Sequence, residues 1–162
     1  HYKSIYSNYF SYNTICTSGG QFCFKTIEFP ELGESIKFNI WDTNGHENAR
    51  SLAKIFYKDA NVVIFVYDIT NESSFQSIKD FWYEEVKKNS ERNPIFAVVA
   101  NKTDLYAEEV VSEYDGKEFA DKIGAIFQPI SAFQIKEFQL FLIILEKLIY
   151  YMDMIIEKNK KD

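Results

Sequence analysis

In the segment KFNIWDTNGHE, residues 37–47, a strand pattern runs directly into a loop of small polar residues, and the other motifs of the chain are interpreted from this segment. Apolar Phe38 and Ile40 alternate with polar neighbours, which is typical of a β-strand with one buried face. Asp42 follows at the strand end, where an acid can hold a metal-bound water, and Gly45 lets a backbone N–H approach a phosphate closely. Taken alone, Asp-x-x-Gly is a weak predictor of function, because many loops contain this pattern.

A second polar segment follows a continuous apolar run. Residues 95–100, IFAVVA, are typical of a strand buried on both faces, and they end on NKTD at 101–104. A later strand is expected to end near SA at 131–132. In α/β proteins the carboxyl ends of parallel strands form the binding edge of the sheet, so these polar segments predict a site there.

Strand and helix patterns alternate along the chain, and the first two strands form a predicted antiparallel hairpin. The expected strands are 21–29, 36–41, 62–67, 95–100 and 125–128. The expected helices are the end of one within 1–10, then 47–58, one that begins after Asn71 or Ser73, one from Ser112 to Lys122 that Gly124 stops, and 135–157. A polar loop is expected over 12–20.

Length and composition narrow the class of protein. The 162 residues suit one domain with a substantial core, and 46% hydrophobic with 26% charged residues is ordinary for a globular protein. The net charge of −6 without a basic stripe argues against a nucleic-acid partner. Cys16 and Cys23 are interpreted as free thiols in a reducing compartment. Charged residues interrupt the apolar segment 138–156, so no membrane-spanning stretch is predicted.

Three motifs, DTNG at 42–45, NKTD at 101–104 and SA at 131–132, resemble in order and spacing the guanine-nucleotide motifs of small Ras-type GTPases. Further segments resemble those that mark Rab proteins within this superfamily: 37–41, 50–52, 56–60 and 65–70. The similarity extends over nearly the whole chain from about Phe10. It implies a single small-GTPase domain over 1–162 with the α/β Ras-like P-loop GTPase fold: a mostly parallel sheet, one antiparallel hairpin strand, and helices on both faces.

The resemblance assigns the base pocket. Asn101 and Asp104 would define it, and the Asp104 carboxylate can accept hydrogen bonds from guanine N1 and N2, a pairing that adenine cannot offer. Lys102 would pack along the base, and the Ala132 N–H, beside Ser131, would meet the guanine O6. Two interpretations of Phe10 remain: an aromatic contact to guanine, or a core residue at a helix end.

The same resemblance assigns the phosphate and metal groups for GTP or GDP with Mg²⁺. The Thr17 hydroxyl would bind Mg²⁺ and its backbone would sense the γ-phosphate, while Asp42 would hold a water of the magnesium ion. The Gly45 N–H would bind the γ-phosphate and order the second switch only in the GTP state.

Two positions depart from the family pattern. His46 replaces the glutamine that orients the attacking water, so we expect slow intrinsic hydrolysis and poor acceleration by activating proteins that rely on the glutamine amide. Alternatively, His46 is a plain solvent-facing switch residue. Phe133 replaces the lysine that normally follows the SA motif, and it either packs over the base or signals a loosened pocket.

Phe22, Trp41 and Phe56 fall where Rab proteins carry three aromatic residues that contact effectors. The alternative interpretation is that they are ordinary core aromatics.

The family's first strand and its Gly-Lys-Ser/Thr phosphate loop would precede Phe10 by about fifteen residues, and the sequence from His1 does not contain them. The family places that strand at the centre of its sheet, so its loss would leave two neighbouring strands with unpaired edges. Two interpretations follow: the sequence is an N-terminally incomplete part of a longer protein, or it is a natural relic that no longer binds nucleotide.

The expected function is a Rab-like switch that binds and slowly hydrolyses GTP and recruits effectors in vesicle traffic. The alternative is a non-catalytic pseudo-GTPase that serves as an interaction module. The family implies effectors, an exchange factor and a GTPase-activating protein as partners of a monomer, in the cytoplasm and peripherally on the cytosolic face of endomembranes. The sequence ends EKNKKD without a cysteine, so membrane attachment would need a prenylated tail beyond Asp162.

Overall fold

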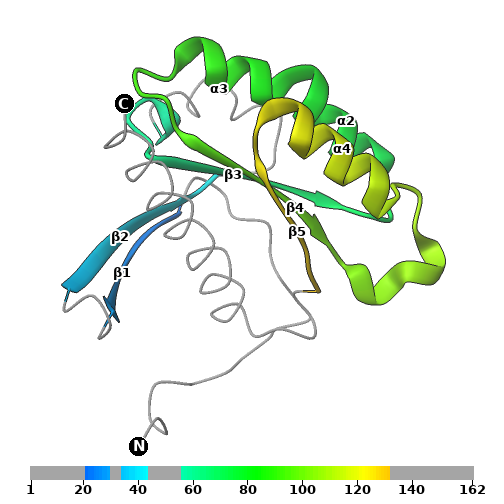
Figure 1. Cartoon of the computed structure of the whole chain (residues 1–162), viewed down its shortest axis with the longest axis horizontal. Coiled ribbons are helices and arrows are strands. Elements are labelled where there is room, and N and C mark those ends of the chain that lie inside the picture. The colour runs from blue at the N-terminus through cyan, green and yellow to red at the C-terminus, as the bar shows by residue number, and fades with distance from the viewer. Residues whose placement is uncertain (1–20, 30–33, 44–55, 132–162) are drawn as a thin grey trace, which may run out of the picture.

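The computed structural model describes residues 21–29, 34–43 and 56–131, which form two β-sheets and a layer of helices (Figure 1). The strands are β1 (Gln21–Phe29), β2 (Glu34–Asp42), β3 (Val62–Asp68), β4 (Ile95–Asn101) and β5 (Ile126–Pro129). The helical segments are α2 (Glu72–Ser77), the π-helical turn η2 (Ile78–Trp82), α3 (Tyr83–Asn89), the 3₁₀ segment η3 (Thr103–Glu108) and α4 (Glu113–Ile123). This order confirms the predicted α/β class.

The β1–β2 hairpin forms an antiparallel sheet of its own. Its register runs from Gln21 opposite Asp42 to Phe29 opposite Glu34, which confirms the predicted pairing. Lys37 is exposed and Phe38 is half-buried, as their alternation predicts.

The other three strands form a parallel sheet with β4 at its centre. The side chains of residues 97–100 are almost fully inaccessible. Val98 and Ala100 belong to the main hydrophobic cluster, and Val99 packs with Ile130 in a second one. Asp68 and Asn101, the last residues of β3 and β4, lie opposite each other in register. The parallel pairing therefore brings these two polar strand ends to one edge.

The strand at 62–67, expected to be buried, is only partly so, because two of its six residues are exposed. Phe65 and Tyr67 are buried, but Ile64 and Val66 on the opposite face are 37% and 55% exposed. Within the described residues β2 and β3 each have one strand neighbour, so the hairpin and the parallel sheet are separate.

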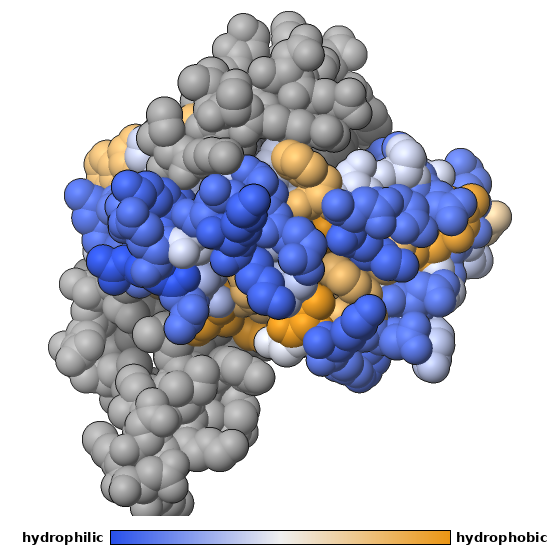
Figure 2. Space-filling view, turned by 90° about the horizontal axis from the view of Figure 1, so that it is seen from above, coloured by the Kyte–Doolittle hydropathy of each residue, from blue (hydrophilic) through white to orange (hydrophobic). Residues whose placement is uncertain are grey.

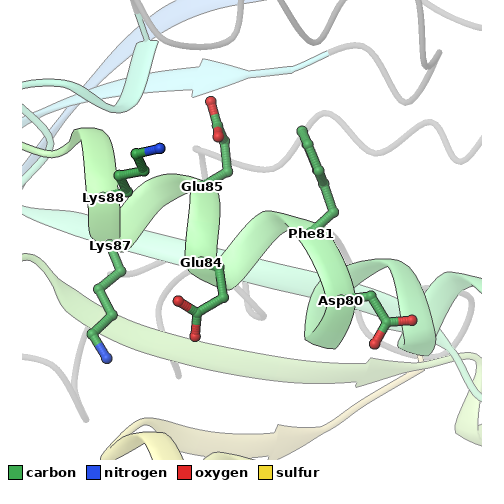
Figure 3. Close-up of a pocket in the computed structure, with 6 residues that line it drawn as sticks. All are labelled: Asp80, Phe81, Glu84, Glu85, Lys87 and Lys88. Carbon is green, nitrogen blue, oxygen red and sulfur yellow. The ribbon is translucent and has the colours of Figure 1, made fainter.

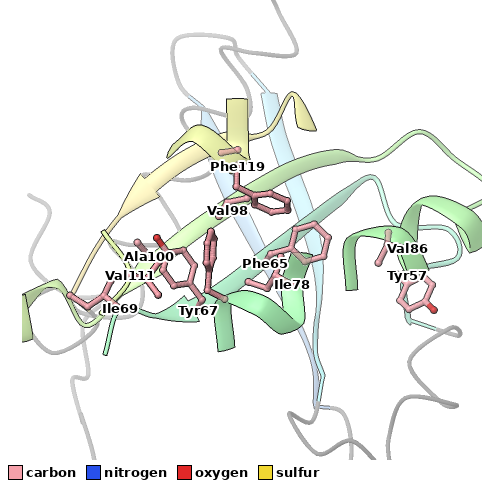
Figure 4. Packing of buried hydrophobic residues seen from close by; sticks show 12 residues of the cluster. Tyr57, Phe65, Tyr67, Ile69, Ile78, Val86, Val98, Ala100, Val111 and Phe119 are labelled. Atoms are coloured by element: carbon pink, nitrogen blue, oxygen red, sulfur yellow. The ribbon is translucent and has the colours of Figure 1, made fainter. Parts of the chain in front are cut away.

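The helices α2, α3 and α4 lie over one face of the parallel sheet and bury its apolar side chains (Figures 1 and 4). Phe65 and Tyr67 of β3 pack with Phe75 of α2 and Phe119 of α4, and the Tyr67 and Phe75 ring centroids are 4.8 Å apart. From the helical side the surface is largely hydrophilic with hydrophobic residues between the charged ones (Figure 2). The fold thus has its core under the helices.

The helix predicted after Asn71 or Ser73 begins after Asn71, and a π-helical turn interrupts it. The Tyr83 N–H donates to the Ile78 carbonyl, one residue further back than in an α-helix. Phe75, Ile78 and Val86 are nevertheless buried, because the apolar residues still gather on one face.

The helix signals around α4 are confirmed. The Ser112 hydroxyl accepts a hydrogen bond from the Asp115 N–H at 3.1 Å, and Gly124 ends the helix in the left-handed conformation with φ of 67°. The chain then enters β5 one residue later than predicted.

Several predictions fall outside the described residues. They are the helices within 1–10 and 135–157, the loop 12–20, and most of the helix 47–58, of which Phe56 and Tyr57 are described and helical. The expectation of helices on both faces therefore stays a prediction for the second face. Within the described segments, no helix has the length and apolar character that a membrane span requires.

Candidate nucleotide-binding site

The polar loop after β4 is fixed by its own hydrogen bonds. The Lys102 N–H donates to the Asn101 Oδ1 at 2.7 Å, and the Thr103 N–H donates to the Ile130 carbonyl at 3.0 Å. Lys102 has φ of 64°, which is uncommon for a side-chain-bearing residue and costs about 1–3 kcal/mol. A conformation of this kind is typical of a binding loop, where the surrounding contacts hold it.

Asp104 and Ser131 join this loop to the end of β5. The Ser131 hydroxyl donates to the Asp104 Oδ1, and the Ser131 side chain is 2% exposed. Ile130, just before it, donates through its N–H to the Ala100 carbonyl at 2.8 Å. The structure therefore brings NKTD and Ser131 together at the carboxyl edge of the sheet, as the motif order predicts; their contacts with a nucleotide stay predictions.

A further polar residue at this edge, Asp68, was not among the predicted site residues. Its Oδ2 lies 2.5 Å from the Lys102 Nζ, and its Oδ1 accepts from the Thr70 N–H at 2.9 Å and the Thr70 hydroxyl at 2.8 Å. Burial opposes ionisation of the Asp68 carboxyl, but the hydrogen bonds from Lys102 and Thr70 outweigh it and lower its pKa. The sequence contained a signal for this residue, because Asp68 is an acid at the end of the apolar strand β3, just as Asp42 is an acid at the end of β2.

The phosphate and metal side of the predicted site is described only at Asp42. Asp42 is exposed at the end of β2, where its carboxylate is free to approach a ligand. The other predicted residues lie outside the described part of the chain: Phe10, Thr17, Gly45, His46, Ala132 and Phe133. The described residues contain no group of three or more metal-binding side chains. An exposed carboxylate at a strand end fits the predicted role of Asp42, which is to hold a water of a nucleotide-bound Mg²⁺, because this ion usually keeps several of its waters.

The three predicted effector-contact aromatics form a row of touching rings. The Phe22 and Trp41 ring centroids are 4.5 Å apart, and those of Trp41 and Phe56 are 5.2 Å apart. Phe22 is 50% and Trp41 48% exposed, while Phe56 is half-buried. Phe22 and Trp41 are therefore not core residues, and the row presents apolar area to solvent.

A hollow on the helical layer belongs to a different part of the surface (Figure 3). Its lining comes from η2 and α3, with Phe81, Glu85 and Lys88 directed to one side and Asp80, Glu84 and Lys87 to the other. None of the residues at the strand ends contributes to it, and its charges are mixed. It is not part of the nucleotide site.

Comparison with known proteins settles the family. The sequence profile described as "Ras family" matches residues 3–150. The chain belongs to the Ras family. This confirms the resemblance that the three motifs carry.

Among characterised relatives the chain is similar to Rab proteins. It is 40% identical over 116 residues to Ras-related protein Rab-22A of Homo sapiens, covering 72% of this chain and 58% of the relative. It is 39% identical over 125 residues to Rab-31 of Mus musculus and 35% identical over 125 residues to RabC of Dictyostelium discoideum, each time covering 77% of this chain and 63% of the relative. The chain thus spans about three-fifths of the length of these relatives.

Proposed function

We propose that this chain is the guanine-nucleotide domain of a Rab-like switch, which binds GTP and GDP with Mg²⁺, hydrolyses GTP slowly and recruits effectors in membrane traffic. The observation that carries the proposal is the Asp104 carboxylate, held by the Ser131 hydroxyl beside the loop of Asn101 and Lys102. A carboxylate acceptor fixed in a partly buried place is what the two N–H groups of guanine require.

The hydrolytic part of the proposal rests on His46 and Gly45. Bound Mg²⁺ would neutralise charge on the phosphate oxygens. Thr17 would bind the ion through its hydroxyl, and Asp42 would hold one of its waters. His46 offers one donor and one acceptor with a reach that differs from that of an amide, so it positions a water less well than glutamine. The expected result is a switch with a long-lived GTP state, ended by an activating protein that supplies its own groups.

The test is a binding titration of the full protein with a fluorescent N-methylanthraniloyl-GDP. Unlabelled GDP should displace the probe and ADP should not, because adenine lacks the hydrogen-bond donors that Asp104 recognises. Asp104→Ala should weaken binding by about 100-fold or more, because it leaves the guanine donors without a partner. Asp121→Asn on the exposed face of α4 is the control and should bind like the parent protein. Equal displacement by ADP and GDP would contradict the proposal.

A second candidate function follows from the exposed aromatic row of Phe22, Trp41 and Phe56. These rings form an apolar surface without requiring a nucleotide in the site. A pseudo-GTPase that binds a partner protein through them is therefore the alternative. A protein that binds its effector equally well with and without guanine nucleotide would favour this alternative over the switch.

The remaining partners and the location are proposed from the Rab-like sequence. They are an exchange factor, an activating protein, and peripheral attachment to the cytosolic face of an endomembrane through a lipidated tail. No nucleic-acid partner is proposed, since the net charge is −6.

A further inference from the structure

We infer that Asp68 is a positioning residue for nucleotide binding: anchored by Thr70, it holds the Lys102 side chain in place at the base pocket. The inference rests on the proposed function, because it assumes that a guanine base packs along Lys102. It adds a residue of β3 to a pocket otherwise made from the ends of β4 and β5.

The Asp68 carboxylate is held so firmly that it can serve as a fixed anchor. One oxygen accepts two hydrogen bonds from Thr70, and the other contacts the Lys102 Nζ at 2.5 Å. The Asp68 N–H donates in addition to the Ser74 Oγ at 3.0 Å. With both oxygens engaged and its side chain 21% exposed, Asp68 has little freedom to follow a moving lysine.

Lys102 is presented in the way a stacking platform requires. Its backbone is held in the left-handed conformation and its ammonium group is fixed by Asp68, so both ends of the side chain are anchored. The side chain is nevertheless 50% exposed, so part of it stays accessible to a ligand. The methylene stem of a lysine can cover apolar surface when its ammonium group has a partner or remains in water. A stem that is already ordered also loses less conformational entropy when a ligand binds.

An ordinary surface ion pair gives the contrast. The Lys117 Nζ and the Asp121 Oδ2 are 2.8 Å apart, but their side chains are 61% and 64% exposed and lie one turn apart on α4. The Asp68–Lys102 pair instead joins two neighbouring strand ends and has a carboxylate with two further donors. Because the Asp68–Lys102 pair lies at the edge of the proposed base pocket, it can position a side chain there, and the α4 pair cannot.

The experiment measures release of N-methylanthraniloyl-GDP from the full protein in excess GDP, with EDTA present so that the base contacts dominate retention. Asp68→Asn should release the probe about 2- to 10-fold faster, the effect expected when one long side chain becomes free to move. Thr70→Ala, which removes one donor to the same carboxylate, should show a smaller increase and gives a second test if Asp68→Asn does not fold. Asp121→Asn should release at the parent rate.

A double-mutant cycle separates positioning from a merely structural role. In a Lys102→Met background, Asp68→Asn and Thr70→Ala should change the release rate less than about 2-fold, because the side chain that they position is gone. Parent-like release from a folded Asp68→Asn or Thr70→Ala protein would overturn the inference, and so would an undiminished effect in the Lys102→Met background. A parent protein that does not bind the probe would overturn the proposed function and the inference with it.

Discussion

The Ser131 hydroxyl donates a hydrogen bond to the Asp104 carboxylate, although the two residues are 27 positions apart in sequence. The bond joins the loop after β4 to the end of β5, and it directs the carboxylate that we propose as the guanine acceptor. Ser131 is almost fully buried, so this orientation does not depend on a flexible surface side chain.

Ser131→Ala should therefore weaken GDP binding. A hydrogen bond to a charged group contributes about 1.5–3 kcal/mol, so the dissociation constant should rise by about tenfold or more. Isothermal titration with GDP measures this change, and Ser90→Ala, which removes an exposed bond to the Arg92 carbonyl, is the matched control. An unchanged GDP affinity in a folded Ser131→Ala protein would show that Asp104 needs no support from Ser131.

Tyr67→Phe should leave the free energy of unfolding unchanged or raise it. The Tyr67 Oη is buried without a hydrogen-bond partner in the described part of the chain, and burial raises the pKa of Tyr67 to about 12. Removing a buried hydroxyl that has no hydrogen-bond partner can raise the free energy of unfolding by up to about 1–3 kcal/mol. In the comparison variant Tyr57→Phe, loss of the hydrogen bond to Glu85 at 3.1 Å should cost about 1 kcal/mol. Urea unfolding measures both, and a larger loss for Tyr67→Phe than for Tyr57→Phe would argue against this description of the core.

Gly116→Ala should destabilise the protein even though alanine favours helix. A methyl group there would lie 2.1 Å from the Tyr67 Oη and 2.9 Å from the Phe127 Cε2. Overpacking of this kind costs about 1–3 kcal/mol, more than the roughly 1 kcal/mol gained in helix propensity. The double variant with Tyr67→Phe should recover part of the loss, since the nearer of the two atoms is gone. Parent-like urea unfolding of Gly116→Ala would show that α4 does not pack this closely on β3.

The Asp68 carboxylate should give stability a defined pH dependence. Its pKa is lowered in the folded state, so its stabilising contribution is complete above the unfolded value of about 3.9 and is lost as the pH falls through the folded value. The difference in unfolding free energy between the parent and Asp68→Asn should therefore be constant from about pH 7 to 5 and shrink below about pH 4. Urea unfolding across this pH range measures the difference between the two proteins. A difference that grew on acidification would contradict a lowered pKa of Asp68 in the folded state.

His46→Gln should accelerate hydrolysis of GTP. The amide supplies a donor and an acceptor with the reach of the usual family residue, so both the intrinsic rate and the response to an activating protein should rise. Single-turnover phosphate release compares the two proteins. If His46→Gln hydrolyses GTP no faster than the parent, His46 is a plain switch residue and the slow rate has another cause.

The sequence predicted the elements whose signals are local. Residues 95–100 read as a doubly buried strand because every one is apolar, and Ser112 and Gly124 carry the cap chemistry of α4. The polar motif NKTD follows strand β4, and the carboxyl ends of parallel strands lie at one edge of a sheet. Its position at that edge could therefore be predicted.

What could not be predicted depends on tertiary contacts. Ile64 and Val66 are as apolar as their buried neighbours, so their exposure follows from where helices and strands lie around β3. The π-helical turn at 78–82 leaves the apolar spacing nearly unchanged and so gives no signal. Asp68 could have been noticed as an acid at a strand end, but its pairing with Lys102, 34 positions away, depends on the β3–β4 register and could not be predicted.

The central claim is that the Asp104 pocket holds a guanine nucleotide. The most direct test is to purify the full protein under mild conditions in Mg²⁺, denature it and identify the released nucleotide by chromatography, with an intact mass on the same sample. We expect stoichiometric GDP or GTP from the parent and a large loss from Asp104→Ala. Release of no nucleotide from a folded parent of known mass, or of an adenine nucleotide, would contradict it.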